Sequence, residues 1–341
     1  MEADEHGGDP IDRMMQASSL LALMEDLRRG LATYWSGADE ILKACGLRLY
    51  MPDADAFSPA KNFFSLLFLY SYRRAGLGRE RCRLYAATLQ CLRGMVTGCD
   101  NLLDDEYKPT LETDIPASGV RFRSVMDIMV SDRVLFAVLA DAAEKGVIPQ
   151  ERILAAVTAS MQTMTRAGVE EAGEEAGITD IWKPEKILAT VHHFKTGILF
   201  QCPWDIPRVI DTVPEATLTP LMEGLYRIGI GCQILDDLVD LALDIRSRKH
   251  NYLASLIHHG SDGDEKARLA RAMTSDGRHD AALDFRCFPT ALQAAGKTAR
   301  QLLSAGLTDL FSAEDRHLVP PAIRFLEKRI GVSTPMPDEV P

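Results

Sequence analysis

The sequence has no run of eighteen apolar residues, so no segment is predicted to cross a bilayer as a helix. Its 7 cysteines include no CxxC pair, and an odd, scattered set is typical of reduced thiols. It also lacks the basic excess that nucleic-acid binding requires, because its formal net charge is −11. The opening stretch MEADEHGGDPIDRMM has neither the basic start nor the apolar centre of a signal peptide. We therefore expect a cytoplasmic protein with no nucleic-acid partner.

The sequence also lacks the alternation of apolar and polar residues that half-buried strands show, and it has no repeat of fixed period. Apolar residues instead recur every three or four positions, which predicts helices. With 341 residues, 46% of them hydrophobic, the chain has enough apolar side chains for a large core. We predict an all-α, single-domain helical bundle over residues 11–332, with disordered tails at 1–10 and 333–341 and the active site inside the bundle.

The helix boundaries follow from periodicity, proline and glycine. Ser58-Pro59 is expected to open a helix as an N-cap followed by proline. Residues 203–214 are expected to be irregular, and residues 261–279 to form a polar, mobile loop. Helices are predicted over 11–42, 60–75, 79–103, 120–144, 153–175, from 184 through Lys195, and over 220–245, 289–305 and 320–330.

Two acidic motifs interrupt apolar helical patterns. Asp236 and Asp240 are four residues apart, so they share one face of a helix, and Asp244 continues that face. Asp100 and Asp104 repeat the same step upstream. Carboxylates in apolar surroundings need a partner or a metal ion. If the two motifs face each other, their oxygen ligands suit Mg²⁺, which keeps waters and shares the phosphates of a substrate.

The motifs DDLVD, preceded by Gln233, and DNLLDDE, with FKTG between them, resemble those of class I isoprenoid synthases. The closest pattern is that of the trans-polyprenyl diphosphate synthases, and the order and spacing agree over about residues 61–257. Either motif alone is weak evidence, since acidic pairs on solvated helix faces are common. The two acidic motifs together, at this spacing and with FKTG between them, are a specific signal.

The resemblance implies a cluster of three Mg²⁺ ions that binds the diphosphate of an allylic prenyl substrate. It assigns metal binding to one set of carboxylates and diphosphate binding to a set of basic and polar side chains. The implied metal ligands are Asp100, Asp104, Asp105, Asp236, Asp237 and Asp240. The implied diphosphate ligands are Lys195, Thr196, Lys249 and Lys61, and the implied catalytic residues are Lys195, Arg93 and Gln233. A homodimer is the expected assembly.

The departures from the family pattern concern the site for isopentenyl diphosphate. Only Lys61 remains of a GGKR-type motif, and Arg93 stands in place of a histidine. The arginine pair that follows the first motif is absent, and Arg121 and Arg123 cannot be aligned with it. Asn101 replaces an Asp, so it offers a carbonyl oxygen with one charge fewer, which Asp105 or Glu106 is expected to restore.

An intact ionisation site beside a weakened acceptor site favours a terpene-synthase-like enzyme, in which the cation is cyclised or quenched. One alternative is a prenyltransferase that couples the allylic diphosphate to isopentenyl diphosphate. Another is a non-catalytic partner subunit of such a synthase. The substrate tail is expected to run along the helix before Asp100, over Leu92, Met95 and Val96, with Cys232 opposite. These side chains are smaller than the aromatic residues that, in the synthases of this pattern, stop the prenyl chain early. We therefore expect a C15–C20 or longer substrate.

Overall fold

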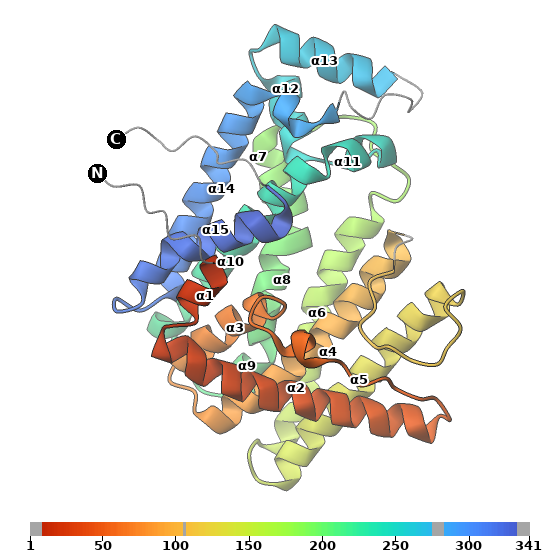
Figure 1. Cartoon of the computed structure of the whole chain (residues 1–341), viewed down its shortest axis with the longest axis vertical. Helices are drawn as coiled ribbons and strands as arrows, with labels where there is room; N and C mark the ends of the chain where they lie inside the picture. The colour runs from red at the N-terminus through yellow and green to blue at the C-terminus, as the bar shows by residue number, and fades with distance from the viewer. Residues whose placement is uncertain (1–8, 105–106, 275–282, 333–341) are drawn as a thin grey trace. The chain divides into compact units, whose positions relative to one another are not determined.

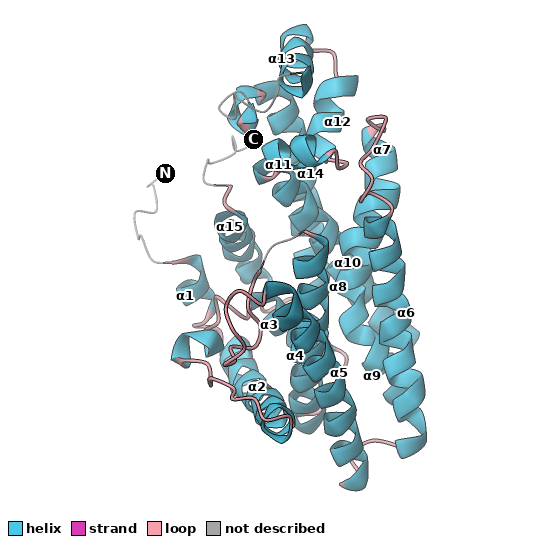
Figure 2. Cartoon of the chain, turned by 90° about the vertical axis from the view of Figure 1, so that its right-hand side faces the viewer, coloured by secondary structure: helices cyan, strands magenta, loops and turns pink. Residues whose placement is uncertain are grey.

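A computed structural model describes residues 9–104, 107–274 and 283–332. These residues form helices joined by turns and loops, with no strand among them (Figure 2). Within this part of the chain no helix is long and apolar enough to span a membrane. The all-α prediction is confirmed. The helices, labelled as in Figure 1, are α1 (Pro10–Met14), α2 (Ser18–Ala44), α3 (Phe63–Arg74), α4 (Arg79–Leu103), α5 (Val120–Glu144), α6 (Ile153–Ala172), α7 (Pro184–Ile187), the π-helix η3 (Leu188–Gly197), α8 (Ile198–Gln201), α9 (Asp205–Ile210), α10 (Glu215–Val239), α11 (Leu241–Ser247), α12 (Tyr252–His259), α13 (Gly263–Thr274), α14 (Pro289–Leu310) and α15 (Val319–Ile330).

The helices gather into two compact units. One, which we call the Asp100 unit, comprises Ile11–Met164 and Cys202–Thr219. The other, the Lys195 unit, comprises Met1–Pro10, Thr165–Gln201 and Pro220–Pro341. Each unit therefore draws on discontinuous parts of the chain, and each carries one of the two acidic motifs.

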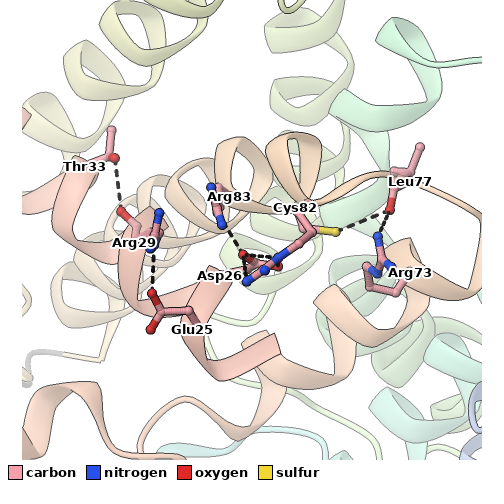
Figure 3. A network of polar contacts seen from close by, with 9 residues as sticks. Glu25, Asp26, Arg29, Thr33, Arg73, Leu77, Cys82 and Arg83 are labelled. Atoms are coloured by element: carbon pink, nitrogen blue, oxygen red, sulfur yellow. Dashed lines mark hydrogen bonds and ion pairs between the residues drawn. The ribbon is translucent and has the colours of Figure 1, made fainter. Parts of the chain in front are cut away.

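In the Asp100 unit, α2, α4 and α5 pack on one another. Glycines on α4 permit the close approach of α5, because a Cβ at Gly94 would lie 2.1 Å from Ser131 Oγ and one at Gly98 2.6 Å from Ile128 Cγ1. The buried carboxylate of Asp26 on α2 accepts hydrogen bonds from Arg79 and Arg83 of α4. Figure 3 shows Arg83 beside Asp26. Since a buried carboxylate needs such partners, this contact fixes α2 against the helix that ends in the first acidic motif.

In the Lys195 unit, α14 packs against α12 and α15, and α10 crosses α14 closely. A Cβ at Gly231 of α10 would lie 2.7 Å from Leu303 Cγ. On another side of α10, a Cβ at Gly197 would lie 2.4 Å from Tyr226 Cε2, so the end of η3 also approaches α10 closely. The second acidic motif is thus held on a helix that packs against two others.

The structure corrects several predicted boundaries. Residues 11–42 are two helices, α1 and α2, and α3 begins at Phe63, so Ser58-Pro59 does not cap it. Asn62 instead donates to the Ala56 and Ser58 carbonyls and holds a turn there. Residues 205–210 are helical, and the predicted mobile loop contains α13, whose amphipathic pattern was hidden by its many charges. The predicted tails lie outside the described residues, except that Pro10 begins α1 and Asp9 pairs with Lys328.

Candidate active site

The π-helix η3 carries the FKTG motif of the Lys195 unit. The segment begins as α7 with Pro184 in its first turn, a position where the missing N–H costs no hydrogen bond. It then widens, and the Ile198 N–H donates to the His193 carbonyl five residues earlier. Such π segments often mark functional sites. Here the segment directs His192 and Thr196 toward α10.

Lys195 lies among carboxylates. Its Nζ is 3.5 Å from Glu171 Oε1 near the end of α6. Burial by itself lowers the pKa of Lys195, but the charges of Glu171, Asp237 and Asp244 outweigh burial and raise this pKa above its usual value. A raised pKa keeps the Lys195 ammonium group charged at neutral pH, as a diphosphate ligand requires.

Lys249 lies near the same group of charges. Burial raises the pKa of Glu174, and the positive charges of Lys195 and Lys249 both act against that rise. One glutamate therefore lies within electrostatic reach of both predicted diphosphate-binding lysines. Lys249 follows Arg248, which ends α11 in the left-handed conformation with φ 53° and whose carbonyl accepts the Ile178 N–H at 2.7 Å.

The three aspartates of the second motif have different surroundings. Asp236 is exposed and Asp240, which precedes α11, is half-buried. Asp237 is 3% exposed, and its carboxylate accepts hydrogen bonds from His192 Nε2, Gln233 Nε2 and the Tyr252 N–H at 2.9, 3.0 and 2.6 Å. Burial would raise the pKa of Asp237, but His192 and these hydrogen bonds hold it below its usual value. Asp236 and Asp240 are thus the more accessible pair.

The site carries an excess of negative charge. Burial, and then the charge of Asp237, raises the pKa of Asp244 to about 7. Within the described residues, no three His, Cys, Asp or Glu side chains converge as a preformed metal centre. Mg²⁺ does not need one, because it is usually bound by one or two carboxylates, waters and substrate phosphates. Accessible hard oxygen ligands in a region of excess negative charge fit this ion.

The first motif lies at the end of α4 in the Asp100 unit. Asp100 is half-buried and Asp104, at the helix end, is exposed. Asp105 lies outside the described residues. Asn101 is 3% exposed, and its amide makes two hydrogen bonds to the backbone of Lys108: Nδ2 donates to the carbonyl at 3.0 Å, and Oδ1 accepts the N–H at 2.9 Å. The carbonyl oxygen that the sequence offered to a metal ion is therefore already bonded to the backbone of Lys108.

Asn101→Asp should separate these two roles. An aspartate accepts but does not donate, so it would leave the Lys108 carbonyl without its donor and place two oxygens against each other. We expect the free energy of unfolding to fall by about 1–3 kcal/mol, with no gain in Mg²⁺ affinity, measured by urea denaturation and by activity against Mg²⁺ concentration. A variant that is as stable as wild type and needs less Mg²⁺ would show that position 101 is a metal ligand.

Lys61 and Arg93, the predicted acceptor-site residues, lie near each other in the Asp100 unit. The Lys61 Nζ is 2.6 Å from Asp55 Oδ2, and its hydrogen bond to Asp55 raises the pKa of Lys61. The positive charge of Arg93 acts in the opposite direction. Two basic side chains from distant parts of the sequence are thus close enough to interact, with Asp55 paired to one of them.

Sequence analysis missed several residues of the Lys195 unit. Glu171 lies 3.5 Å from Lys195, Glu174 influences Lys195 electrostatically, and His192 bonds to Asp237. Asn251 donates to Asp244 Oδ2 at 2.8 Å and to the Asp237 carbonyl at 2.7 Å. The acidic run Glu170–Glu175 at the end of a predicted helix was the one available signal. Nothing local indicated the others, because they depend on contacts between distant segments.

The chain matches known proteins by structure but not by sequence. No family model matches the chain, and no curated protein sequence matches it. Solved structures do match over nearly its whole length. A decaprenyl diphosphate synthase from Rhodobacter capsulatus is 19% identical with a TM-score of 0.61, over 94% of this chain and 99% of that one.

Two other matching structures contain ligands. A polyprenyl synthase from Caulobacter crescentus, complexed with calcium and isoprenyl diphosphate, is 14% identical with a TM-score of 0.62, over 91% of this chain and 97% of that one. A geranylgeranyl pyrophosphate synthase from Corynebacterium glutamicum, complexed with isoprenyl diphosphate and magnesium, is 17% identical with a TM-score of 0.58, over 90% and 98%. The chain therefore has the fold of the polyprenyl diphosphate synthases.

Proposed function

We propose that the protein is a Mg²⁺-dependent class I isoprenoid synthase that ionises an allylic prenyl diphosphate and releases inorganic diphosphate. The observation that carries the proposal is the grouping of Lys195 and Lys249 around Glu174, close to the carboxylates of the second acidic motif. Cationic side chains beside accessible carboxylates suit a diphosphate bound with divalent cations. Proteins of the same fold bind isoprenyl diphosphate together with calcium or magnesium.

The side chains have distinct roles in this proposal. Lys195, Lys249 and Thr196 bind the diphosphate, and Lys195 stabilises the negative charge that develops on it as the C–O bond breaks. Asp236 and Asp240 of the second acidic motif supply oxygen ligands to Mg²⁺, and Asp100 and Asp104 of the first motif are proposed as metal ligands in the same way. Bound Mg²⁺ would neutralise the leaving group. Apolar walls would keep water from the cation until it is cyclised or quenched.

Elongation is the second candidate, and the proximity of Lys61 and Arg93 favours it. Arg and Lys side chains bind phosphate groups, so this pair suits a second diphosphate, here that of isopentenyl diphosphate. Two proteins of the same fold are a decaprenyl diphosphate synthase and a geranylgeranyl pyrophosphate synthase. Arg93→Ala should then reduce coupling and leave single-substrate ionisation unchanged, whereas equal loss of both activities would argue against a separate acceptor site.

The decisive experiment measures release of inorganic diphosphate from C10, C15 and C20 allylic diphosphates, each with and without Mg²⁺ and isopentenyl diphosphate. Mass spectrometry identifies the products. Mg²⁺-dependent release without isopentenyl diphosphate supports cyclisation or quenching, and release that requires it supports coupling. Absence of release from every substrate would refute the enzymatic proposal and favour a non-catalytic partner subunit.

The length of the substrate depends on the predicted pocket floor. Leu92 and Met95 are buried on α4 and Val96 is half-buried, one to two turns before Asp100. Met95→Phe with Val96→Phe should shift the preference from C15–C20 to shorter diphosphates, because two aromatic rings fill space that the prenyl tail needs. The chain-length profile of a double variant with wild-type circular dichroism tests this. An unchanged profile would place the tail elsewhere.

We also propose that the protein forms a homodimer. Phe122, Met129 and Phe136 on α5 are exposed large apolar side chains spaced seven residues apart, so they lie on one face of the helix. Such a face is self-complementary when a second copy packs against it. Light scattering after gel filtration gives the mass. Phe122→Lys with Phe136→Lys should yield monomers, and a monomeric wild-type protein would refute the proposal.

A further inference from the structure

A buried histidine–aspartate pair joins the FKTG segment to the second acidic motif. His192 is 1% exposed and Asp237 is 3% exposed. His192 Nε2 lies 2.9 Å from Asp237 Oδ2. An ionised carboxylate only accepts hydrogen bonds, so Nε2 carries the proton and donates it. The pair thus fixes both the ring orientation and the tautomer of His192.

Asp237 accepts hydrogen bonds from three different segments of the chain. Besides His192 it accepts from Gln233 Nε2 at its other oxygen and from the Tyr252 N–H at the start of α12. A carboxylate has about four acceptor positions, and these three hydrogen bonds leave little capacity for a metal ion. Its neighbours in the motif, Asp236 and Asp240, are exposed and half-buried. The motif therefore has an inward-facing member and two more accessible ones.

The network returns to the π-helix through Gln233. Gln233 Oε1 accepts a hydrogen bond from Thr196 Oγ1, while its Nε2 donates to Asp237. His192 and Thr196, four residues apart on η3, are therefore both bound to α10. Lys195 lies between them in the sequence. Movement of the Lys195 segment relative to Asp236 would break at least one of these hydrogen bonds.

We propose that His192 is a positioning residue, which acts through Asp237 and Gln233 to hold the Lys195–Thr196 segment and the second acidic motif in the geometry that binds a Mg²⁺–diphosphate complex. Asp237 then serves as the anchor, and Asp236 and Asp240 are the metal ligands of this motif. The inference rests on the proposed function, since it assigns the same site to the same ligand class. Its specific content is that a side chain buried away from the ligand controls the affinity.

Binding of inorganic diphosphate in the presence of Mg²⁺, measured by isothermal titration calorimetry on the full chain, tests the inference. His192→Phe keeps a ring but removes the donor, and we expect the dissociation constant to rise about 10–100-fold, as when an outer-shell partner is removed. His192→Gln places an amide N–H near the position of Nε2 and should recover most of the affinity. His193→Phe is the matched control, because His193 adjoins His192 but bonds to Tyr226, and it should bind like wild type.

A second measurement separates positioning from general stability. If His192 acts through the Lys195 segment, its effect should shrink when Lys195 is already Ala, so the two losses should not add. Wild-type affinity in His192→Phe, or fully additive losses in the double variant, would overturn the inference. Should His192→Phe fail to fold, His192→Gln decides, because an affinity as low as that of Lys195→Ala would contradict rescue by the donor.

The outcome is also distinguishable from failure of the proposed reaction. Suppose that wild-type protein binds Mg²⁺–diphosphate but releases no inorganic diphosphate from any prenyl diphosphate. The proposed reaction would then be refuted, and the dissociation constants of wild type and the His192 variants would still test the inference. Wild-type protein that turns over substrate, with His192→Phe unchanged in Mg²⁺ dependence and affinity, would refute the inference alone. Wild-type protein that does not bind Mg²⁺–diphosphate would refute both.

Discussion

Asp236→Ala should abolish release of diphosphate while leaving the helical fold intact. Asp236 is the exposed carboxylate of the second motif, so its removal takes away a proposed metal ligand and leaves the apolar core of the helix unchanged. The variant should therefore keep the helical circular dichroism of wild type. We expect turnover at saturating Mg²⁺ to fall to background, measured by diphosphate release. Asp100→Ala should do the same in the other unit.

Thermal unfolding tests whether the Asp236→Ala variant still binds Mg²⁺ with diphosphate. Mg²⁺ with diphosphate should raise the melting temperature of wild type, because a ligand at about 100 times its dissociation constant adds about 2.7 kcal/mol to the free energy of unfolding. The Asp236→Ala variant should show little of this shift. Asp264→Ala, which removes an acidic residue from the first turn of α13, is the control. Wild-type turnover in Asp236→Ala would exclude this residue as a ligand.

Lys195→Ala should lower turnover by about 10²–10³-fold, the scale for loss of one preorganised group that stabilises developing charge. The surrounding carboxylates keep Lys195 charged, so the group is present in its active form before the substrate arrives. The loss should appear mainly in kcat if Lys195 acts on the charge that develops as the bond breaks, and mainly in KM if it only binds the ground state.

Lys183→Ala is the matched control for this variant, because Lys183 is exposed and lies just before α7 in the same segment. It should keep wild-type kinetics. Lys195→Arg retains the charge but not the compact ammonium group, and it should recover part of the rate. If Lys195→Ala and Lys183→Ala have the same rate as wild type, Lys195 belongs to a structural ion pair with Glu171 and the proposed role is wrong.

Sequence reasoning succeeded where the information was local and periodic. The limits of α4 and α5 follow from apolar periodicity with a glycine directly before each helix, and both helices begin and end where the pattern predicts. Periodicity failed where charge masked an amphipathic helix, as in α13, and where proline lies inside a helix, as at Pro220 of α10. Pro220 is the sixth residue of α10, so the helix continues through a proline that removes one of its backbone hydrogen bonds.

The spacing of Asp236 and Asp240, and of Asp100 and Asp104, determined by itself that each pair shares a helix face. It did not determine which member of DDLVD is buried, because that depends on what packs against α10. Only the tertiary structure placed Asp237 against His192 and Tyr252, and Lys195 against Glu171. Likewise only the two hydrogen bonds between Asn101 and Lys108 showed why position 101 carries an amide. These are contacts between segments distant in sequence, whose partners are chosen by packing and hydrogen bonding rather than by local pattern.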